Sequence, residues 1–279
     1  MSVYIHCGLR SPIGVLNGQY KHMRPEVLGA KVIDALINCH SISQVDGLFC
    51  GNAVGTGGNI GRLMGLMCNL PNSVPAITVD MQCASALMSI EMAYTHIASG
   101  VMDAVIAGGI ESSSLQPERV YALGDDRKGT YKVAQFTPQD QSPLAMLEGA
   151  ERTIYKHNVT KEDLYPHIIG SHQRASAALD NSYLQSYIMP ITIDGKRCID
   201  ECIRPTMNEK LLSRMKPLLG ADSITNAGNA CLTHDGAAFV YLSNKKGPFK
   251  IHSVKPWAGN PQFSPEGALE STEGILKRT

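Results

Sequence analysis

Charged residues are scarce in this sequence, and neither sign is in surplus. They make up 18% of the 279 residues, and 25 basic side chains balance 25 acidic ones for a formal net charge of zero. With 43% hydrophobic residues, this composition excludes a disordered tail, a collagen-like chain, a small disulfide scaffold and a nucleic-acid binder driven by bulk charge. The low charge and the 26 glycines favour an α/β protein with much buried surface.

Long apolar runs are also lacking. No segment approaches the roughly 18 apolar residues that a bilayer-spanning helix needs. The first residues, MSVYIHCGLRSPIG, do not contain the long apolar core of a secretory signal peptide. We therefore expect a cytoplasmic protein with neither a membrane nor a nucleic acid as its partner.

Closely spaced cysteine pairs are a third absence. The sequence has eight cysteines but no Cys-x-x-Cys pair of the kind that binds zinc or performs redox chemistry. We expect no metal site, and we expect most of the thiols to be reduced, buried small hydrophobic groups. The eight are Cys7, Cys39, Cys50, Cys68, Cys83, Cys198, Cys202 and Cys231.

Residues 76–109 hold the most informative pattern. An apolar strand, AITVDMQ, is followed by Cys83, by the helix-like ALMSIEMAYTHIASG and by a second strand, DAVIAGG. This order predicts a βαβ unit and therefore a parallel sheet. The helix is apolar on nearly every side, which predicts burial between two layers.

Other elements follow from the same periodicity. We predict helices over 25–38 and 62–70, and a strand around 45–54 that runs into the glycine-rich GNAVGTGGNIGR. Residues 112–204 form a mixed polar insertion in which Thr160 is the expected N-cap of a helix. The buried strand FVYLS should rejoin the first sheet, FKIHSVKPWAG should add one more strand, and a helix begins in the final SPEGALESTEGILKRT.

Cys83 is the candidate nucleophile. It lies where a strand meets a buried helix, and the unpaired N–H groups and dipole of a helix N-terminus stabilise a thiolate. The small neighbours Ala84, Ser85 and Ala86 leave room for a substrate. The alternative is that Cys83 is one more buried thiol.

Several blocks then resemble one family in its own order and spacing. RSPIG, VDGLFCGNAVGTGGNIGR, VPAITVDMQCASALMSIEMA and DAVIAGGIESSS closely resemble the thiolases, the acyl-CoA acetyltransferases. The resemblance continues through MLEGAERTIYKHNVTKEDL, DECIRP, MKPLL and NAGNACLTHDGAA, so it covers nearly the whole chain. Cys83 stands in the place of the family's acyl-accepting cysteine.

The resemblance implies a thiolase-like α/β fold: one βαβαβαββ half with an inserted, mostly helical loop domain. Four parts are expected: the start of the N-terminal half, an inserted coenzyme A-binding loop domain, a return to the N-terminal half, and a linker with the start of a C-terminal half. They cover residues 1–112, 113–204, 205–247 and 248–279.

The family's contacts with coenzyme A carry over to matching positions. No cofactor is expected to stay bound; coenzyme A or acyl-CoA is the substrate. Arg204 matches the arginine near the adenine, and Met146 matches a methionine of the pantetheine tunnel. The other matched binding positions are Leu219, Ala227, Ala230 and Cys231.

Some positions depart from the family pattern. Cys231 replaces the usual serine, so one hydrogen bond to pantetheine is weakened or lost. Ala86 replaces a glycine and narrows the corner, Ala145 replaces the loop histidine, and His234 replaces the asparagine of an Asn-Asp-Gly turn, where we interpret it as a turn residue.

The second thiolase half is the larger departure. In the family it supplies a Gly-His-Pro histidine, an Asn-Glu motif and a second cysteine in a Cys-x-Gly segment, and the 279 residues do not include that half. The histidine would accept the nucleophile's proton and the second cysteine would move the substrate proton. We therefore expect this chain alone to be impaired in carbon–carbon bond formation unless a separate C-terminal-half chain completes it. The resemblance also implies a homo-oligomer, a dimer or a tetramer.

Two other hypotheses about the function remain open. The chain could be a non-catalytic, scaffold-like acyl-CoA-binding protein completed by a partner. It could also be a ketoacyl synthase acting on carrier-protein thioesters, although such enzymes usually lack the large insertion and the NAGNA-type loop. The GTGGN and AGGIES stretches do not have the spacing of a dinucleotide fingerprint, so a nicotinamide site is not expected.

Overall fold

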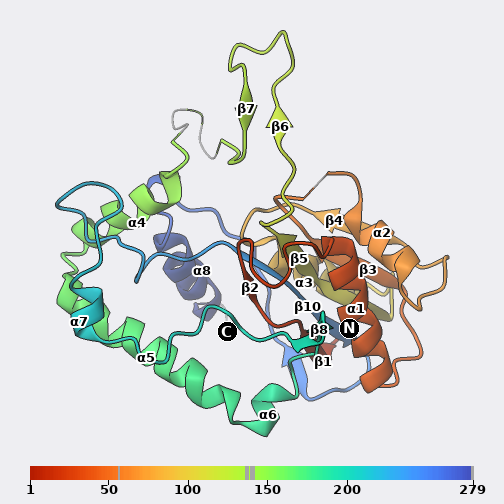
Figure 1. Cartoon of the computed structure of the whole chain (residues 1–279). Coiled ribbons are helices and arrows are strands. Elements are labelled where there is room, and N and C mark those ends of the chain that lie inside the picture. The colour runs from red at the N-terminus through yellow and green to blue at the C-terminus, as the bar shows by residue number, and fades with distance from the viewer. Residues whose placement is uncertain (56, 136–137, 139–141, 278–279) are drawn as a thin grey trace. The chain divides into compact units, whose positions relative to one another are not determined.

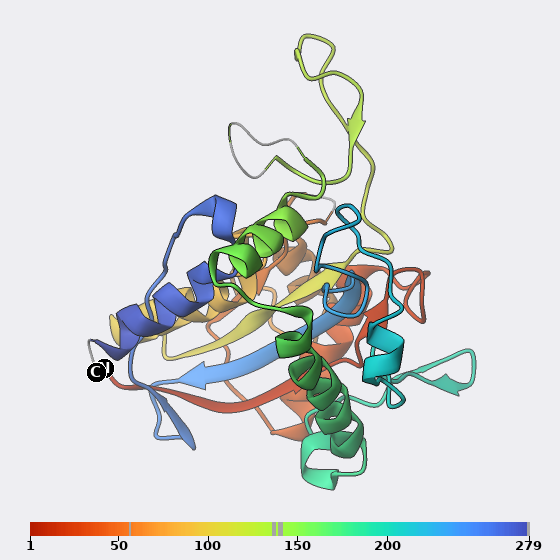
Figure 2. The same ribbon diagram turned by 90° about the vertical axis from the view of Figure 1, so that its left-hand side faces the viewer.

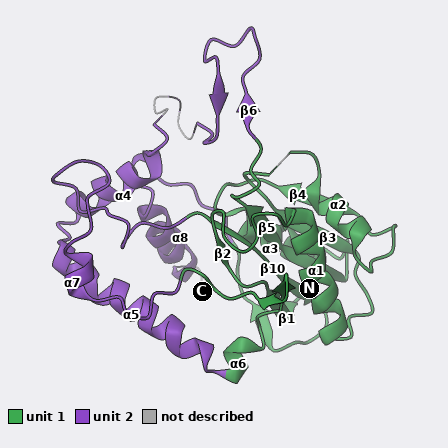
Figure 3. Ribbon diagram, in the orientation of Figure 1, with its two compact units in different colours: residues 1–117, 182–202, 233–254 green, residues 118–181, 203–232, 255–279 purple. Residues whose placement is uncertain are grey.

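The computed structural model describes residues 1–55, 57–135, 138 and 142–277. The chain divides into two compact units (Figure 3). Unit 1 contains residues 1–117, 182–202 and 233–254, and unit 2 contains residues 118–181, 203–232 and 255–279. The expected insertion over 113–204 therefore contributes to both units.

A seven-stranded sheet is the centre of unit 1 (Figures 1 and 2). Its order is β11-β1-β10-β5-β3-β4, and β2 pairs with β10. The strands β3, β4 and β5 are parallel, as the βαβ pattern predicts, whereas β10 is antiparallel to both β5 and β1. The sheet is therefore mixed. The strands are β1 Val3–Arg10, β2 Gly14–Val15, β3 Gly47–Gly51, β4 Ala76–Val79, β5 Ala104–Ser112, β10 His234–Ser243 and β11 Phe249–Ile251.

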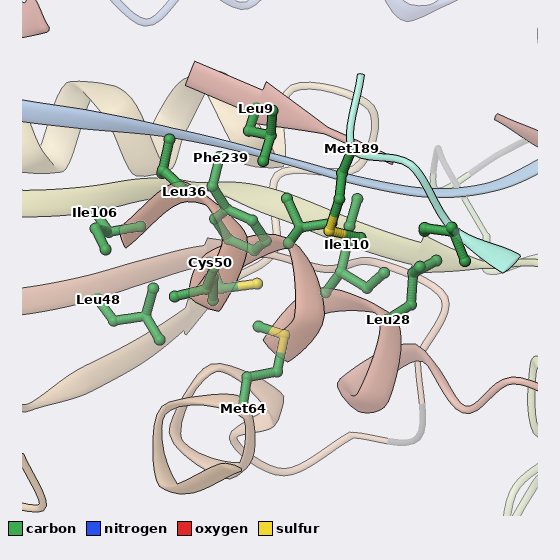
Figure 4. Packing of buried hydrophobic residues seen from close by; sticks show 14 of the residues in the cluster. Leu9, Leu28, Leu36, Leu48, Cys50, Met64, Ile106, Ile110, Met189 and Phe239 are labelled. Carbon is green, nitrogen blue, oxygen red and sulfur yellow. The ribbon is translucent and has the colours of Figure 1, made fainter. Parts of the chain in front are cut away.

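Both faces of the central strand β3 are covered, and its side chains alternate between two clusters. Leu48 and Cys50 of β3 pack with helices α1 (Pro25–Cys39) and α2 (Ile60–Met67), as Figure 4 shows for Leu28, Leu36 and Met64. Phe49, between them in sequence, packs on the opposite face with Ala93 and Ile97 of helix α3 (Ser85–Ala98). This alternation explains why the strand sequences are continuously apolar.

Helix α3 differs from its prediction. Only Ser85, Ser89, Ala93 and Ile97 of this helix are buried, and Leu87 on another side is 71% exposed. The helix covers the sheet with one stripe instead of being enclosed between two layers. The apolar sequence of a helix indicates which of its faces can be buried. It does not indicate which other segments will cover those faces.

Unit 2 is built mainly from helices and loops. Thr160 caps α5 as predicted: its side chain accepts from the N–H of Asp163 and the Asp163 carboxylate accepts from the N–H of Thr160. The elements here are β6 Arg119–Val120, β7 Thr130–Tyr131, α4 Ala145–Lys156, α5 Lys161–Leu179, α7 Glu209–Leu212, the 3-10 turn η1 Pro261–Phe263 and α8 Glu266–Leu276.

The segment 182–202 adds short elements to unit 1. They are α6 Ser182–Gln185, β8 Thr192–Ile193 and β9 Lys196–Arg197. Among the helices of the described residues, none has the length and apolar character needed to cross a membrane.

Candidate active site

Cys83 lies in a tight turn between β4 and α3. β4 ends at Val79, α3 begins at Ser85, and the thiol-bearing residue between them is exposed. A bridge pairs Met81 with Cys83 across Gln82. The N-terminus of a 14-residue helix thus follows directly after the cysteine, in the position that favours negative charge.

The residue before Cys83 has an unusual backbone. Gln82 has φ +50°, in the left-handed region that non-glycine residues seldom occupy. A residue in this conformation costs on the order of 1–3 kcal/mol and persists only where its surroundings hold it. Here the Asp80 carboxylate accepts from the N–H of Gln82 at 2.9 Å. The Ser85 hydroxyl donates to the carbonyl oxygen of Gln82 at 2.6 Å.

The first turn of α3 packs closely against glycines of the sheet. A Cβ on Gly51 would come within 2.5 Å of the Ala86 nitrogen, and one on Gly109 would come within 3.0 Å of the Ala86 Cβ. Ser89, one turn further along, donates to the Gly108 carbonyl oxygen at 2.8 Å. The position of the corner therefore depends on Gly51 and Gly109, and Ala86 is already in close contact with the sheet.

The other cysteines divide by exposure. None of the eight, all of which the structure describes, forms a disulfide. Burial raises the pKa of the Cys7 thiol to about 11 and those of Cys50 and Cys68 to about 12, so these thiols are poor nucleophiles at neutral pH. Only Cys50 and Cys198 are buried, so the prediction that most of the cysteines are buried was wrong. Cys39, Cys83 and Cys231 are exposed.

The loop 217–231 in unit 2 carries four of the predicted coenzyme A positions. The N–H of Leu218, next to Leu219, donates to the Thr225 carbonyl oxygen at 2.9 Å, which closes the loop on itself. Side chains brace its turn: Asn226 accepts from the N–H of Gly228 at 2.8 Å, and Asn229 accepts from that of Asn226 at 2.7 Å. Ala227 and Cys231 are exposed, and Leu219 and Ala230 are partly buried.

A buried carboxylate anchors this loop to α4. Glu151, 8% exposed, accepts from the N–H groups of Ile224 at 2.7 Å and Thr225 at 2.9 Å and from the Thr225 hydroxyl. Burial raises the pKa of this carboxyl, but the hydrogen bonds from Thr225 and Ile224 outweigh it and hold the pKa below its usual range. Glu151 is therefore ionised and bonded at neutral pH.

The two remaining binding candidates also lie in unit 2. Met146, in the first turn of α4, is 47% exposed. Arg204 is partly buried, and its backbone N–H donates to Nδ1 of His172 on α5 at 3.2 Å. Every predicted coenzyme A contact thus belongs to unit 2, and Cys83 belongs to unit 1.

His234 is a strand residue. It begins β10 and pairs with Val15, so the interpretation as a turn residue was wrong. Its Nε2 is buried and has no hydrogen-bond partner within the described part of the chain. No group of three metal-ligating side chains occurs among the residues that the structure describes.

Comparison with known proteins agrees with this arrangement. The family model described as "Thiolase, N-terminal domain" matches residues 3–246. The chain belongs to the thiolase family.

Relatives within the thiolases are only moderately similar. The chain is 32% identical over 246 residues to "Putative acetyl-CoA C-acetyltransferase VraB" of Staphylococcus haemolyticus, covering 85% of this chain and 64% of that protein. A protein of the same name from Staphylococcus aureus is 30% identical over 249 residues, covering 87% and 65% of the two chains. The chain thus spans less than two thirds of the length of these thiolases.

A solved thiolase structure shares the fold. The crystal structure of the Bacillus anthracis acetyl-CoA acetyltransferase superposes with a TM-score of 0.79 at 23% identity, over 98% of this chain and 76% of the other. This likeness confirms the predicted thiolase-like α/β fold.

Sequence reasoning missed three residues of this thiolase corner and loop. Asp80 and Ser85 hold Gln82, and Glu151 holds the 224–225 backbone. A serine two residues after the cysteine and an acidic residue three before it are a weak signal of side-chain bonding to a turn. Glu151 gives no such signal, because its partners are more than seventy residues away.

Proposed function

We propose that the chain is a thiolase-type acyltransferase in which Cys83 accepts an acyl group from acyl-CoA. The observation that carries the proposal is the Cys83 turn: an exposed thiol directly before the N-terminus of α3. Family membership and the burial of Cys50 and Cys198 support the same choice among the cysteines.

The proposed step transfers one acyl group. The Cys83 thiolate attacks the thioester carbonyl carbon, a new C–S bond forms, and the bond from that carbon to the sulfur of coenzyme A breaks. The proton lost by the Cys83 thiol ends on the departing coenzyme A sulfur. Backbone N–H groups at the start of a helix are suited to stabilise the oxyanion that forms in between.

The acyl-CoA would bind through the unit 2 positions that match the family. Arg204 would lie near the adenine, Met146 along the pantetheine tunnel, and Ala227, Ala230 and Cys231 beside the pantetheine arm. Leu219 is a further matched binding position. The exposure of Ala227 and Cys231 is compatible with ligand contact. The acyl-enzyme would then serve acetoacetyl-CoA formation or 3-ketoacyl-CoA cleavage, with the residues of a second thiolase half needed for full turnover.

A second candidate is a thiolase-like acyl-CoA-binding subunit completed by another chain. The observation that favours it is the uncovered side of α3. Leu87 is 71% exposed, and an apolar cavity of about 290 Å³ in unit 1 is lined by Ala86 and Ile90 of α3 and by Ala238 and Val240 of β10. Both candidate functions are compatible with a homo-oligomer. The exposed Ile77 on the edge strand β4 supports pairing between copies of the chain.

Mass spectrometry of the intact chain with acetyl-CoA separates the candidates. The acyltransferase predicts one added acetyl group on the wild type and on Cys39→Ala, a matched change of another exposed cysteine, but none on Cys83→Ala. Acetylation that persists in Cys83→Ala would refute the assignment of the nucleophile. Saturable binding of coenzyme A without any adduct would favour the binding subunit.

A further inference from the structure

The backbone at Gln82 is held from both sides by side chains. The Asp80 carboxylate accepts from its N–H at 2.9 Å, and the buried Ser85 hydroxyl donates to its carbonyl oxygen at 2.6 Å. Ser85 also accepts from the N–H of Met81 at 2.8 Å. One hydroxyl therefore joins the start of α3 to both residues that lead into Cys83.

This bonding holds the backbone of Gln82, the residue directly before Cys83. Gln82 occupies a conformation that its own sequence does not favour, with φ +50°. If the turn relaxed, the peptide that links Gln82 to Cys83 would rotate. The N–H, Cα and Sγ of Cys83 would then move away from the N-terminus of α3.

We propose that Ser85 is a positioning residue for Cys83, acting through the Gln82 backbone. The inference deepens the proposed function and rests on it. Ser85 itself makes no contact with the reacting atoms in this scheme; it sets the angle at which the Cys83 thiolate meets the thioester carbonyl. Displacement of a reacting group by about 1 Å can slow a reaction on the order of a hundredfold.

Ser89 provides a matched control on the same helix. It is fully buried, and its one hydroxyl proton is shared between the carbonyl oxygens of Ala86 at 2.7 Å and Gly108 at 2.8 Å. Neither partner lies in the turn 80–83. Replacement of Ser89 by alanine removes comparable bonds from the same helix without freeing Gln82.

The test compares wild type, Ser85→Ala, Ser85→Thr and Ser89→Ala in the full chain. Acetylation of Cys83 by acetyl-CoA is followed over time by intact mass, at several substrate concentrations. We expect Ser85→Ala to lower the maximal acetylation rate by at least about tenfold without raising the half-saturating concentration. Ser85→Thr, which keeps the hydroxyl, should restore most of the rate, and Ser89→Ala should acetylate like wild type. Thermal unfolding of each variant shows whether the two alanine variants lose similar stability.

A second readout is independent of acyl-CoA. Iodoacetamide alkylates exposed thiols, and the rate at Cys83 is read by peptide mass. We expect Ser85→Ala to slow it by about threefold, because the displaced thiolate loses the favourable end of the helix dipole, and Ser89→Ala to leave it unchanged. Alkylation of Cys39 should be equal in all variants.

The outcomes separate the two hypotheses. A wild type that is not acetylated overturns the proposed function, and the alkylation rates still decide whether Ser85 controls Cys83. A wild type that is acetylated at the same rate as Ser85→Ala overturns the positioning role alone. Equal slowing in Ser85→Ala and Ser89→Ala would also overturn it, since the effect would then be one of helix stability.

Discussion

The carboxylate of Glu151 accepts a hydrogen bond from the backbone N–H of Thr225 at 2.9 Å, across 74 residues of sequence. The same carboxylate accepts from the N–H of Ile224 at 2.7 Å. The loop that carries the proposed pantetheine contacts therefore depends on one buried anion on α4. Removal of that anion should loosen the loop while the helix remains.

Glu151→Gln should speed hydrogen exchange at the Ile224 and Thr225 amides. Hydrogen bonds to a charged group contribute about 1.5–3 kcal/mol, and a neutral amide replaces them poorly. Glu148→Gln is the control, because Glu148 lies on the same helix and accepts from the Ser142 hydroxyl at 2.8 Å. Unchanged exchange at Ile224 in Glu151→Gln would contradict the anchoring role.

The Glu151 carboxyl should also make the stability of the protein depend on pH. Its folded-state pKa is lowered, so its contribution is fully present above the unfolded value of about 4.3. That contribution should be lost as the pH falls from there through the lowered folded-state pKa. Thermal unfolding between neutral and acid pH should therefore show a steeper loss of Tm for wild type than for Glu151→Gln. Parallel curves would show that Glu151 titrates alike in both states.

Arg10 and Asp200 should couple energetically. Two parallel hydrogen bonds of 2.8 Å join them, and Asp200 also accepts from the N–H of Ile13 at 2.8 Å. Burial raises the pKa of Asp200, but the bonds from Arg10 and Ile13 outweigh it and lower the pKa overall. We expect Asp200→Ala to cost about 2 kcal/mol in urea unfolding, with a coupling to Arg10→Ala of at least about 1 kcal/mol in a double-mutant cycle.

The pair Arg24 and Glu26 is the control for that cycle. It is an ion pair of 3.2 Å in which the arginine side chain is 69% exposed. Such pairs contribute less than about 1 kcal/mol. Equal coupling in the two cycles would mean that the Arg10–Asp200 geometry adds nothing.

The βαβ core was predictable because its signals are local. The alternation of strand and helix patterns over 76–109 predicts β4, α3 and β5, and the Thr160 cap precedes an acidic first turn. The antiparallel direction of β10 was not predictable, because the apolar sequence of a strand does not show in which direction it runs relative to its neighbours. The direction follows only from its pairing with β5 and β1.

The Cys83 corner was predictable in place but not in geometry. Cysteine between a strand and an apolar helix marks the position, and small neighbours indicate space. The left-handed backbone of Gln82 gives no sequence signal, since glycine or asparagine is the usual residue there. Arg10 and Asp200 are 190 residues apart, so no local pattern could have paired them.

Gly51→Ala should displace α3 from the sheet. The new Cβ would lie 2.5 Å from the Ala86 nitrogen and from the Ser85 carbonyl carbon, which are backbone atoms that cannot swing aside. We expect a loss of about 1–3 kcal/mol in urea unfolding. We also expect slower alkylation of Cys83, because the corner moves with the helix.

Gly65→Ala is the matched control in α2: its Cβ would meet Leu48 at 3.4 Å, an ordinary contact. Alanine favours a helix by up to about 1 kcal/mol over glycine, so Gly65→Ala should keep or raise stability and leave Cys83 unaffected. Equal stability of the two variants would show that α3 does not rest on Gly51 as closely as the structure has it.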